Sequence, residues 1–308
     1  MTSILPLYVI IPNWNLKQDT IACVESLLAA AGRMASAAES VRILVVDNGS
    51  SDGSPDALTA AFGERVEQVL MRHNTGFAIA VNAGMRYALT HDAAVVLLIN
   101  NDTILDGDML SILKETLEAP TAARIGIASP AIYYWSEPQR LWRLGDRERP
   151  WSPIPVRIAP GEAAQTLIEA DYVTGCGMLI RREVIEQVGP FDERFFMYFE
   201  DADLCKRAKR AGFRVACVPP AKMWHKVSVS ASREKAASAY WRTCGRALFY
   251  RKHVRGGRMA VIALYLCAKA AWSVLGFALR GEFEQAGAVL RGIVAGFRTS
   301  RAQEAAIG

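Results

Sequence analysis

The sequence predicts an α/β fold with a doubly wound, mostly parallel sheet, followed by a helical C-terminal extension. Residues 1–130 alternate apolar runs with helix-like segments, which is the order expected of a βαβ series. The run VVLLI at Val95–Ile99 carries no polar residue and is typical of a parallel strand buried on both faces. Residues 231–308 show helix-like patterns. We therefore divide the chain into a main domain at 1–230 and a helical region at 231–308.

The elements of the main domain are expected in a regular order. A long irregular excursion, rich in tryptophan and proline, is expected at 135–165. Over 166–226 the strands VTGCGMLI and RVACV are expected, with a short helix and an acidic segment at a helix start between them. Before the excursion, the expected strands are Leu7–Ile11, Arg42–Asp47, Val66–Met71 and Val95–Ile99, and the expected helices are Thr20–Ala31, Gly76–Leu89 and Asp106–Glu118.

Charge is distributed unevenly along the chain. Residues 222–308 hold 15 Lys and Arg against 4 Asp and Glu, whereas the other 221 residues hold 21 against 27. A basic segment usually meets nucleic acid or an anionic membrane surface. Because this basic segment is also apolar, it favours the membrane, and nucleic acid is not expected as a partner.

Met259–Leu279 is apolar along its whole length except for Lys269 near its middle. This length is sufficient to span a bilayer, and a buried core helix or a helix lying in the membrane interface are the alternatives. A central Lys is costly in hydrocarbon, and both flanks are basic, so they give no orientation bias. We therefore favour peripheral attachment to the membrane over a single pass.

The cysteines and the N-terminus indicate a reducing compartment. No C-x-x-C pair occurs, so the six cysteines are expected to be buried small hydrophobic residues and not disulfide partners. The N-terminal apolar run lacks a basic flank and is too short for a signal peptide. We expect a cytoplasmic protein that is peripheral on the cytoplasmic face of the inner membrane.

Asp47 ends an expected buried strand and opens the segment DNGSSDGS. Its carboxylate can accept the imide N–H of a uracil or thymine ring, and the glycine and serine residues allow a tight turn beside a ligand. A turn closed by the Asp47 side chain, with no ligand, explains the same residues.

Small residues fill the segment NTGFAIAVNAG at Asn74–Gly84. They leave the start of a helix open, so that a diphosphate can approach its backbone N–H groups. Close packing of a helix on the sheet is the alternative explanation. No G-x-G-x-x-G or G-x-x-x-x-G-K-[ST] loop occurs, which argues against a dinucleotide or P-loop site.

Asn100, Asn101 and Asp102 follow VVLLI directly and so belong at the carboxyl edge of the sheet, where ligands of such folds bind. Asp102 can bind a divalent cation that also holds a diphosphate, and Asn100 can hydrogen-bond a ribose. A polar helix cap is the alternative interpretation of this short segment.

An acidic segment, FFMYFEDAD, carries Glu200, Asp201 and Asp203 behind an aromatic run, and a lone His225 follows after a strand-like segment. Such acids and a histidine can supply a general base and a metal ligand. The aromatic residues argue against full solvation of Glu200 and Asp201. We expect Asp203 to lie in a solvated first helical turn, where acids are favourable in any case.

Taken in order, these segments resemble the family 2 glycosyltransferases of the GT-A fold, with the nearest likeness to bacterial rhamnosyltransferase-like members. The resemblance covers residues 5–255. Its pieces are VIIPNWN, VVDNGSSDGS, NTGFAIAVNAGMRYAL, LLINNDT, the long run from VTGCGMLI through FFMYFEDADLCKRAKRAGF, and His225.

The resemblance implies an inverting transfer of a sugar, with rhamnose as the first expectation, in bacterial cell-surface glycan synthesis. The donor would be a dTDP- or UDP-sugar, and the acceptor a glycan or a polyprenyl-linked sugar. Asp201 would be the general base, with Glu200 as second choice, and Asp102 and His225 would hold Mg²⁺ or Mn²⁺ on the diphosphate. The implied donor contacts are Pro12, Asn13, Trp14, Asp47, Asn48, Gly76, Phe77, Asn82, Asn100, Asn101, Asp102 and Gly175.

One position departs from the family's D-x-D motif, because Asn100 stands where the first Asp is usual. That position is thought to contact ribose more than metal, so we expect an active enzyme with a reduced affinity for metal. A catalytically inactive sugar-nucleotide-binding or scaffold protein is the main alternative, and Asp102, Asp201 and His225 weigh against it. A nucleotidyltransferase would need a basic, glycine-rich N-terminal loop, which VIIPNWN does not supply.

Overall fold

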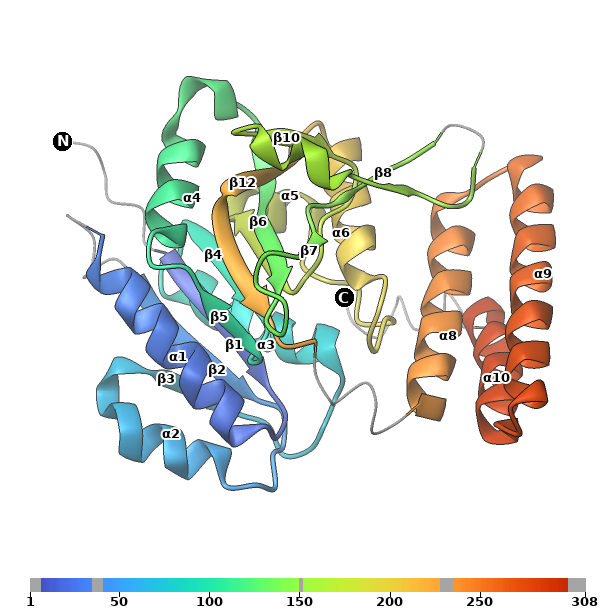
Figure 1. Cartoon of the computed structure of the whole chain (residues 1–308), viewed down its shortest axis with the longest axis horizontal. Helices are drawn as coiled ribbons and strands as arrows, with labels where there is room; N and C mark the ends of the chain where they lie inside the picture. Colours follow the sequence, from blue (N-terminus) through green and yellow to red (C-terminus); the bar gives the residue numbers. More distant parts are fainter. Residues whose placement is uncertain (1–6, 35–40, 150–151, 228–234, 299–308) are drawn as a thin grey trace. The chain divides into compact units, whose positions relative to one another are not determined.

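A computed structural model describes residues 7–34, 41–149, 152–227 and 235–298 of the chain (Figure 1). The chain divides into two compact units: unit 1 contains 1–191 and 204–227, and unit 2 contains 192–203 and 228–308. The boundary expected at 230/231 lies outside the described residues. Sequence analysis assigns the acidic segment to the main domain, whereas the structure groups 192–203 with the C-terminal helices.

Unit 1 is built on a mixed sheet with the strand order β10-β12-β6-β11-β4-β1-β2-β3. One half is entirely parallel: β1 (Leu7–Asn13) lies between β4 (Val95–Ile99) and β2 (Val41–Asp47), and β3 (Glu67–Leu70) forms the edge. Each of these strands coincides with an expected apolar run. The βαβ order of the sequence therefore does produce a parallel sheet at this end.

The other half of the sheet is mixed, because β11 (Gly177–Arg181) runs antiparallel to both β4 and β6 (Ile125–Tyr134). Next to β6, in parallel, lies β12 (Arg214–His225), which is longer than the expected strand RVACV. The register of this pair shifts between Val218 and Lys222, where Pro219 and Pro220 cannot donate ladder hydrogen bonds. Beyond this irregularity the strand resumes and ends at His225.

Short strands complete the sheet. β10 (Ile168–Ala170) and β5 (Thr103–Leu105) pair with β12, and β7 (Leu141–Arg143) pairs with β6. The expected irregular excursion at 135–165 thus contains some regular structure, although Trp151 lies outside the described residues. Its remaining elements are β8 (Asp146–Arg147), β9 (Val156–Arg157) and the 3-10 turn η4 (Pro160–Ala164).

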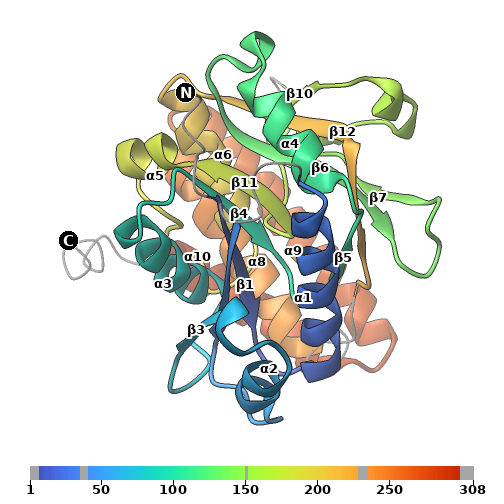
Figure 2. The same cartoon turned by 90° about the vertical axis from the view of Figure 1, so that its left-hand side faces the viewer.

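Helices cover both faces of the sheet in unit 1. Figure 2 shows α1 (Lys17–Gly32) and α4 (Met109–Glu118) on one face, and α3 (Phe77–Thr90) on the other. β4 serves both layers: Val95, Leu97 and Ile99 join the core cluster of α1 and α4, and the alternate residues face the opposite way. The other helical elements are α2 (Ser54–Phe62), η2 (Gly63–Arg65), η3 (Pro120–Ala122) and α5 (Arg182–Val188).

Within the described residues, unit 2 contains three helices and the acidic segment. These helices are α8 (Lys235–His253), α9 (Arg258–Leu279) and α10 (Phe283–Arg298), and the acidic segment leads into α6 (Glu200–Arg210), which continues into unit 1. α10 packs closely on α8 through Gly292 and Gly296. A Cβ at either position would lie 2.5 Å from a backbone carbonyl oxygen of α8, so glycine is needed there.

α9 and α10 each expose several large apolar residues, and we call these residues together the apolar face. α9 is not a buried core helix, because among its large apolar residues only Ile262 and Leu266 are buried. By length and composition α9 is able to cross a membrane, although a single such helix is weak evidence. The expectation that all cysteines are buried is wrong for Cys267, which is exposed on α9. The apolar face comprises Val261, Leu264, Trp272, Leu275, Leu279, Phe283, Leu290, Val294 and Phe297.

Candidate functional site

A buried asparagine joins the carboxyl ends of three parallel strands in unit 1. Asn13 ends β1 and lies in register with Asp47 at the end of β2. Its amide donates to the Asp47 carboxylate (Nδ2 to Oδ1, 2.8 Å), and its carbonyl oxygen accepts from Asn101, which follows β4 (2.9 Å), and from the Thr20 hydroxyl (2.7 Å). Residues from three predicted motifs therefore share one hydrogen-bond network.

Asp47 is held in a fixed orientation by this network. Its side chain is 3% exposed, and its second oxygen accepts the backbone N–H of Ser50 at 2.9 Å. The turn that sequence analysis offers as an alternative explanation is therefore present. A carboxylate has about four acceptor sites, so these bonds orient Asp47 and still leave it able to accept a further N–H.

Asn48 places the start of α3 beside the end of β2. Its amide donates to the Gly76 carbonyl (3.1 Å) and to the Asn74 side chain (3.1 Å), and its oxygen accepts the Thr75 backbone N–H (2.9 Å). Gly76 precedes α3 with a φ of 90°, a conformation that favours glycine. The backbone at the start of α3 therefore lies at the same edge of the sheet as Asp47.

Two of the predicted donor contacts have clear partners within the fold. The Asn82 amide donates to the Phe191 carbonyl (2.9 Å), and its oxygen accepts the Phe191 N–H (3.0 Å). The Asn101 amide is engaged by Asn13, and also by Thr20 at 3.0 Å. The predicted donor contacts of Asn82 and Asn101 thus gain no support from this geometry.

Four further predicted donor residues line or border this region. Phe77 packs against Phe191 with ring centres 6.3 Å apart, and a Cβ at Gly175 would lie 3.4 Å from the Phe77 ring. Pro12 is half-buried at the end of β1. The side chain of Trp14, the residue after Asn13, is 40% exposed. Of these four, Trp14 offers the most surface to a ligand.

Strand pairing brings Asp102 and His225 together from opposite ends of the main domain. β5 pairs with the end of β12 so that Thr103 lies opposite His225. Asp102 Oδ1 then lies 3.1 Å from His225 Nε2, and both side chains are buried. The edge of Trp142 on β7 contacts the histidine ring, with centres 4.8 Å apart. In the sequence, Trp142 falls within the expected irregular excursion, so the contact between Trp142 and His225 is not predicted.

Two buried polar atoms beside this pair have no hydrogen-bond partner among the described residues. They are His225 Nδ1 and the side-chain oxygen of Asn100. Buried polar atoms are almost always hydrogen-bonded, so such atoms point to a group that binds from outside the chain. A hydroxyl donor would satisfy Asn100.

A divalent cation fits the Asp102–His225 pair. The 3.1 Å separation of Oδ1 and Nε2 is close to the spacing of adjacent ligands in an octahedron with bonds of about 2.1 Å. Within the described part of the chain, no group of three or more His, Cys, Asp or Glu side chains is arranged to hold a metal. A cation here would therefore take its remaining ligands from water and from a bound phosphate group, as Mg²⁺ commonly does.

The other half of the predicted site lies in unit 2. Asp203 is fully buried, so the expectation of a solvated turn is wrong. Its Oδ1 lies 2.7 Å from His253 Nε2 and 2.7 Å from Lys252 Nζ, both on α8. Lys252 also contacts Asp192 at 2.6 Å. These charges neutralise one another and fasten both ends of the acidic segment to α8.

The backbone of this segment is strained just before Glu200. Tyr198 and Phe199 have φ values of 72° and 74°, which cost about 1–2 kcal/mol for each non-glycine residue. Close packing holds this conformation: a Cβ at Gly245 would lie 2.6 Å from the Tyr198 carbonyl oxygen. Strain of this kind persists only where the surrounding structure enforces it, and it clusters at functional sites.

The two candidate bases differ in their surroundings. Glu200 is 5% exposed, and its Oε2 has no hydrogen-bond partner among the described residues. Burial, and then the charges of Asp201 and Asp203, raise the pKa of Glu200 well above the ordinary value of 4.5. Asp201 is only half-buried. Of the two acids, Asp201 is therefore the one that a substrate can reach more easily.

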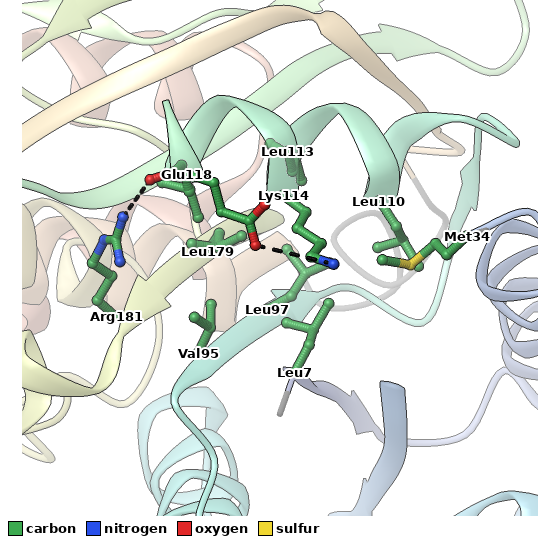
Figure 3. A pocket seen from close by; sticks show the side chains of 11 residues that line it. Leu7, Met34, Val95, Leu97, Leu110, Leu113, Lys114, Glu118, Leu179 and Arg181 are labelled. Atoms are coloured by element: carbon green, nitrogen blue, oxygen red, sulfur yellow. Dashed lines mark hydrogen bonds and ion pairs between the residues drawn. The ribbon is translucent and has the colours of Figure 1, made fainter. Parts of the chain in front are cut away.

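A separate apolar pocket lies at the opposite edge of the sheet in unit 1. It has a cavity of about 50 Å³ and adjoins the beginnings of β1 and β4 at Leu7 and Val95, under α4. Figure 3 shows leucines of the sheet and of α4 on its walls, with the Lys114–Glu118 ion pair and Arg181 at its rim. The residues of the Asn13 network and the Asp102–His225 pair do not line it, so it is not the candidate site.

Comparison with known proteins gives a consistent result. The family model described as "Glycosyltransferase like family 2" matches residues 6–249. The N-acetylglucosaminyl-diphospho-decaprenol L-rhamnosyltransferase of Mycobacterium tuberculosis is 27% identical over 230 residues, covering 64% of this chain and 70% of the relative. The dTDP-rhamnosyl transferase RfbF of Shigella flexneri is 26% identical over 188 residues, covering 60% of each chain.

A solved structure shares the fold. The mannosyltransferase PcManGT of Pyrobaculum calidifontis, determined in complex with GDP-Man and Mn²⁺, superposes with a TM-score of 0.60 at 17% identity. The match covers 95% of this chain and 87% of that one. The mixed α/β architecture with C-terminal helices is thus that of a known glycosyltransferase fold.

Proposed function

Because this chain belongs to the glycosyltransferase-like family 2, we propose that it transfers a sugar from a nucleoside-diphosphate donor to a lipid-linked or polysaccharide acceptor. One observation carries the proposal. At the carboxyl edge of the parallel sheet, Asp102 and His225 face each other, and among the described residues neither His225 Nδ1 nor the buried side-chain oxygen of Asn100 has a hydrogen-bond partner. This is the arrangement expected of a site that binds a cation together with a phosphorylated ligand.

The donor contacts follow from the geometry of unit 1. Asp47 is oriented by Asn13 and Ser50 and would accept the imide N–H of a pyrimidine base. The unsatisfied oxygen of Asn100 would accept a ribose hydroxyl. Trp14 is exposed beside this edge and would cover the bound nucleotide. Rhamnose is the first candidate for the sugar, because two relatives carry rhamnosyl transfer in their names.

Asp102 and His225 would hold Mg²⁺ or Mn²⁺. The structurally similar mannosyltransferase PcManGT was determined in complex with Mn²⁺. When bound, such a cation offsets the negative charge that develops on the leaving nucleoside diphosphate. The chain itself fixes the two ligands: strand pairing positions the histidine, and Trp142 packs against its ring. A ligand held in one orientation needs no reordering when the donor binds.

Asp201 would act as the general base. It would take the proton of the acceptor hydroxyl while the oxygen forms a bond to the anomeric carbon. The bond from that carbon to the donor diphosphate breaks, and the diphosphate leaves with the electron pair. A single displacement of this kind inverts the anomeric centre. Glu200 is less suited to the role, because its side chain is buried, whereas that of Asp201 is half-buried and easier for an acceptor to reach.

The apolar face of α9 and α10 supports peripheral attachment to a membrane. Trp272 is 78% exposed and Leu264 is 73% exposed, and such apolar residues on two adjacent helices are typical of an interfacial surface. Replacing Trp272 and Leu275 by Ser should weaken sedimentation with anionic vesicles. Unchanged sedimentation would assign attachment to another part of the chain.

Isothermal titration tests the donor proposal directly. The purified protein would be titrated with dTDP-rhamnose, UDP-glucose, UDP-galactose and UDP-N-acetylglucosamine, with and without Mn²⁺. We expect one donor to bind, and to bind more tightly with metal. The Asp102→Asn variant should lose the metal-dependent part of the affinity. Failure of the folded protein to bind any of these donors would contradict the proposal for these sugars.

A further inference from the structure

Two arginines of α8 lie against the strained segment that precedes Glu200. Arg242 lies over Tyr198, with its guanidinium carbon 5.0 Å from the ring centre, and Arg246 lies over Phe199 at 5.6 Å. They are one helical turn apart, so both point to the same side of α8. The contacts with the aromatic rings hold the guanidinium groups in place but leave their N–H donors available.

Neither arginine has a carboxylate partner in the part of the chain that the structure describes. Arg242 is exposed and Arg246 is half-buried, and burial lowers the pKa of Arg246. Among the described residues, the two arginines therefore lie one turn apart without an acidic partner.

The contrast with the rest of unit 2 makes this cluster informative. Lys252 and Arg194 meet Asp192 at 2.6 Å each, and Lys252 also meets Asp203 at 2.7 Å. Where unit 2 uses cations to hold its own structure, it supplies acids to match them. Of the two arginines only Arg246 is partly buried; a partly buried cation without an acidic partner costs free energy, and a bound anion reduces that cost.

We propose that Arg242 and Arg246 bind the phosphate or diphosphate group of a lipid-linked acceptor, an inference that rests on the proposed function. Guanidinium groups recognise phosphate oxygens through paired hydrogen bonds. α9 packs beside α8, which carries both arginines, and α9 exposes Leu264 and Trp272 on the apolar face. A lipid whose phosphate is held by the cations would thus have apolar protein surface available on that helix.

The position of the cluster along the chain fits an acceptor better than a donor. Phe199, which Arg246 contacts, is separated from Asp201 by one residue, Glu200, and Tyr198, which Arg242 contacts, directly precedes Phe199. A sugar attached to a phosphate at this cluster would lie near the proposed base. The Asn13 network and the Asp102–His225 pair, which would hold the donor, belong to unit 1 and need no further cation from unit 2.

Vesicle binding of the full-length protein tests this inference. The vesicles would be phosphatidylcholine alone, phosphatidylcholine with undecaprenyl diphosphate, and phosphatidylcholine with phosphatidylglycerol at the same surface charge. The test variant is R242Q/R246Q. The control variant is R291Q/R298Q, which removes the same charge from two exposed arginines of α10.

We expect the wild type to bind undecaprenyl diphosphate vesicles more tightly than phosphatidylglycerol vesicles of equal charge. R242Q/R246Q should lose this preference, with a weakening of about tenfold or more, as for the loss of charge-assisted hydrogen bonds. R291Q/R298Q should retain the preference. Equal weakening of both variants, or equal weakening on both anionic lipids, would overturn the inference in favour of general attraction to anionic surfaces.

Two measurements separate misfolding and failure of the proposed function from failure of the site. R242K/R246K keeps the charges without the paired donors, so it should bind between the wild type and R242Q/R246Q. Metal-dependent donor binding should be the same in all these variants. If donor binding holds while R242Q/R246Q binds undecaprenyl diphosphate like the wild type, the phosphate site is wrong and the transferase proposal stands. If the wild type binds no donor, the transferase proposal is what fails.

Discussion

The chain contains two buried Asp–His pairs whose surroundings differ. Asp102 and His225 in unit 1 are 3.1 Å apart, and Asp203 and His253 in unit 2 are 2.7 Å apart. Each histidine reaches its aspartate through Nε2, and each pair links segments distant in sequence. By residue type and distance alone, both would qualify as part of a metal site.

Their neighbours distinguish them. Lys252 adds a cation to Asp203 and then reaches Asp192, so the pair in unit 2 belongs to an ion cluster. Among the described residues, the second nitrogen of His225 and the side-chain oxygen of Asn100 have no partner, and in unit 2 the same holds for Glu200 Oε2. The comparison teaches that an acid and a histidine together are not enough to mark a ligand site: the unsatisfied ring nitrogen belongs to His225, whereas the ion pair with Lys252 ties Asp203 into the structure.

The largest expected effect is on the rate of sugar transfer, and it tests whether that rate depends on Asp201, two residues before Asp203. In Asp201→Asn, the transfer rate should fall by about 10²–10⁴-fold, the usual worth of a general base. Donor affinity should not change, because the donor residues lie in unit 1. The measurement is the rate of sugar transfer at saturating donor, with Glu200→Gln as the control. A wild-type rate in Asp201→Asn would remove this residue as the base.

The next largest effect is on the stability of the protein, and it concerns the Asp203–His253 pair. Asp203→Asn would leave Lys252 and His253 facing a neutral group in a buried site, and breaking such a cluster costs about 3–5 kcal/mol. Urea unfolding should show this loss of stability, and the matched change Asp102→Asn should not show it. A stability equal to the wild type would mean that the cluster does not hold the acidic segment on α8.

The parallel half of the sheet was predictable because its signals are local. β4 reads as an uninterrupted apolar run, and its observed bounds equal the expected ones. β6, a central strand, receives no prediction because Gly126 and Pro130 interrupt its pattern. Gly126 is needed there, since a Cβ would lie 2.5 Å from Val184, and Pro130 lies opposite Val218, at the edge of the irregularity in β12. In both cases tertiary packing overrides the local pattern.

The candidate site was predictable only where a family resemblance supplied the distant partner. Asp102 and His225 are far apart in sequence, and no spacing rule joins them, because their contact depends on the pairing of β5 with β12. No resemblance pointed to the burial of Asp203, since its partners on α8 lie about fifty residues further along the chain. Long-range ion pairs of this kind leave no periodic signal in a sequence.

Replacing each histidine in turn separates the two Asp–His pairs by metal affinity and by stability. His225→Ala should lower the affinity for Mn²⁺ in the donor complex by about 10–100-fold, the range found when metal-site residues are altered. His253→Ala should leave that affinity unchanged and lower the thermal stability instead. Titration of donor at several Mn²⁺ concentrations gives the first value, and thermal unfolding gives the second. If His253→Ala were the variant with altered metal affinity, the roles assigned to the two pairs would be reversed.

The smallest expected effect is a pH dependence of stability that comes from Glu200 alone. Its pKa is raised in the folded protein, so the unfolded chain releases this proton first, near pH 4.5. Above that pH, unfolding is accompanied by proton release until the folded-state pKa is reached. The stabilising contribution is therefore complete below about pH 4.5 and is lost as the pH rises, with a slope of at most about 1.4 kcal/mol per unit.

Glu200→Gln removes this dependence, because glutamine does not titrate. Urea unfolding of both proteins between about pH 4 and pH 8 should show the variant gaining stability relative to the wild type as the pH increases. Other acids titrate in both proteins and cancel in the difference. A difference that is constant with pH would show that Glu200 ionises normally, and would return it to equal standing with Asp201 as the candidate base. A rising difference would show that Glu200 keeps its proton to higher pH in the folded protein than in the unfolded chain, and would leave Asp201 as the candidate base.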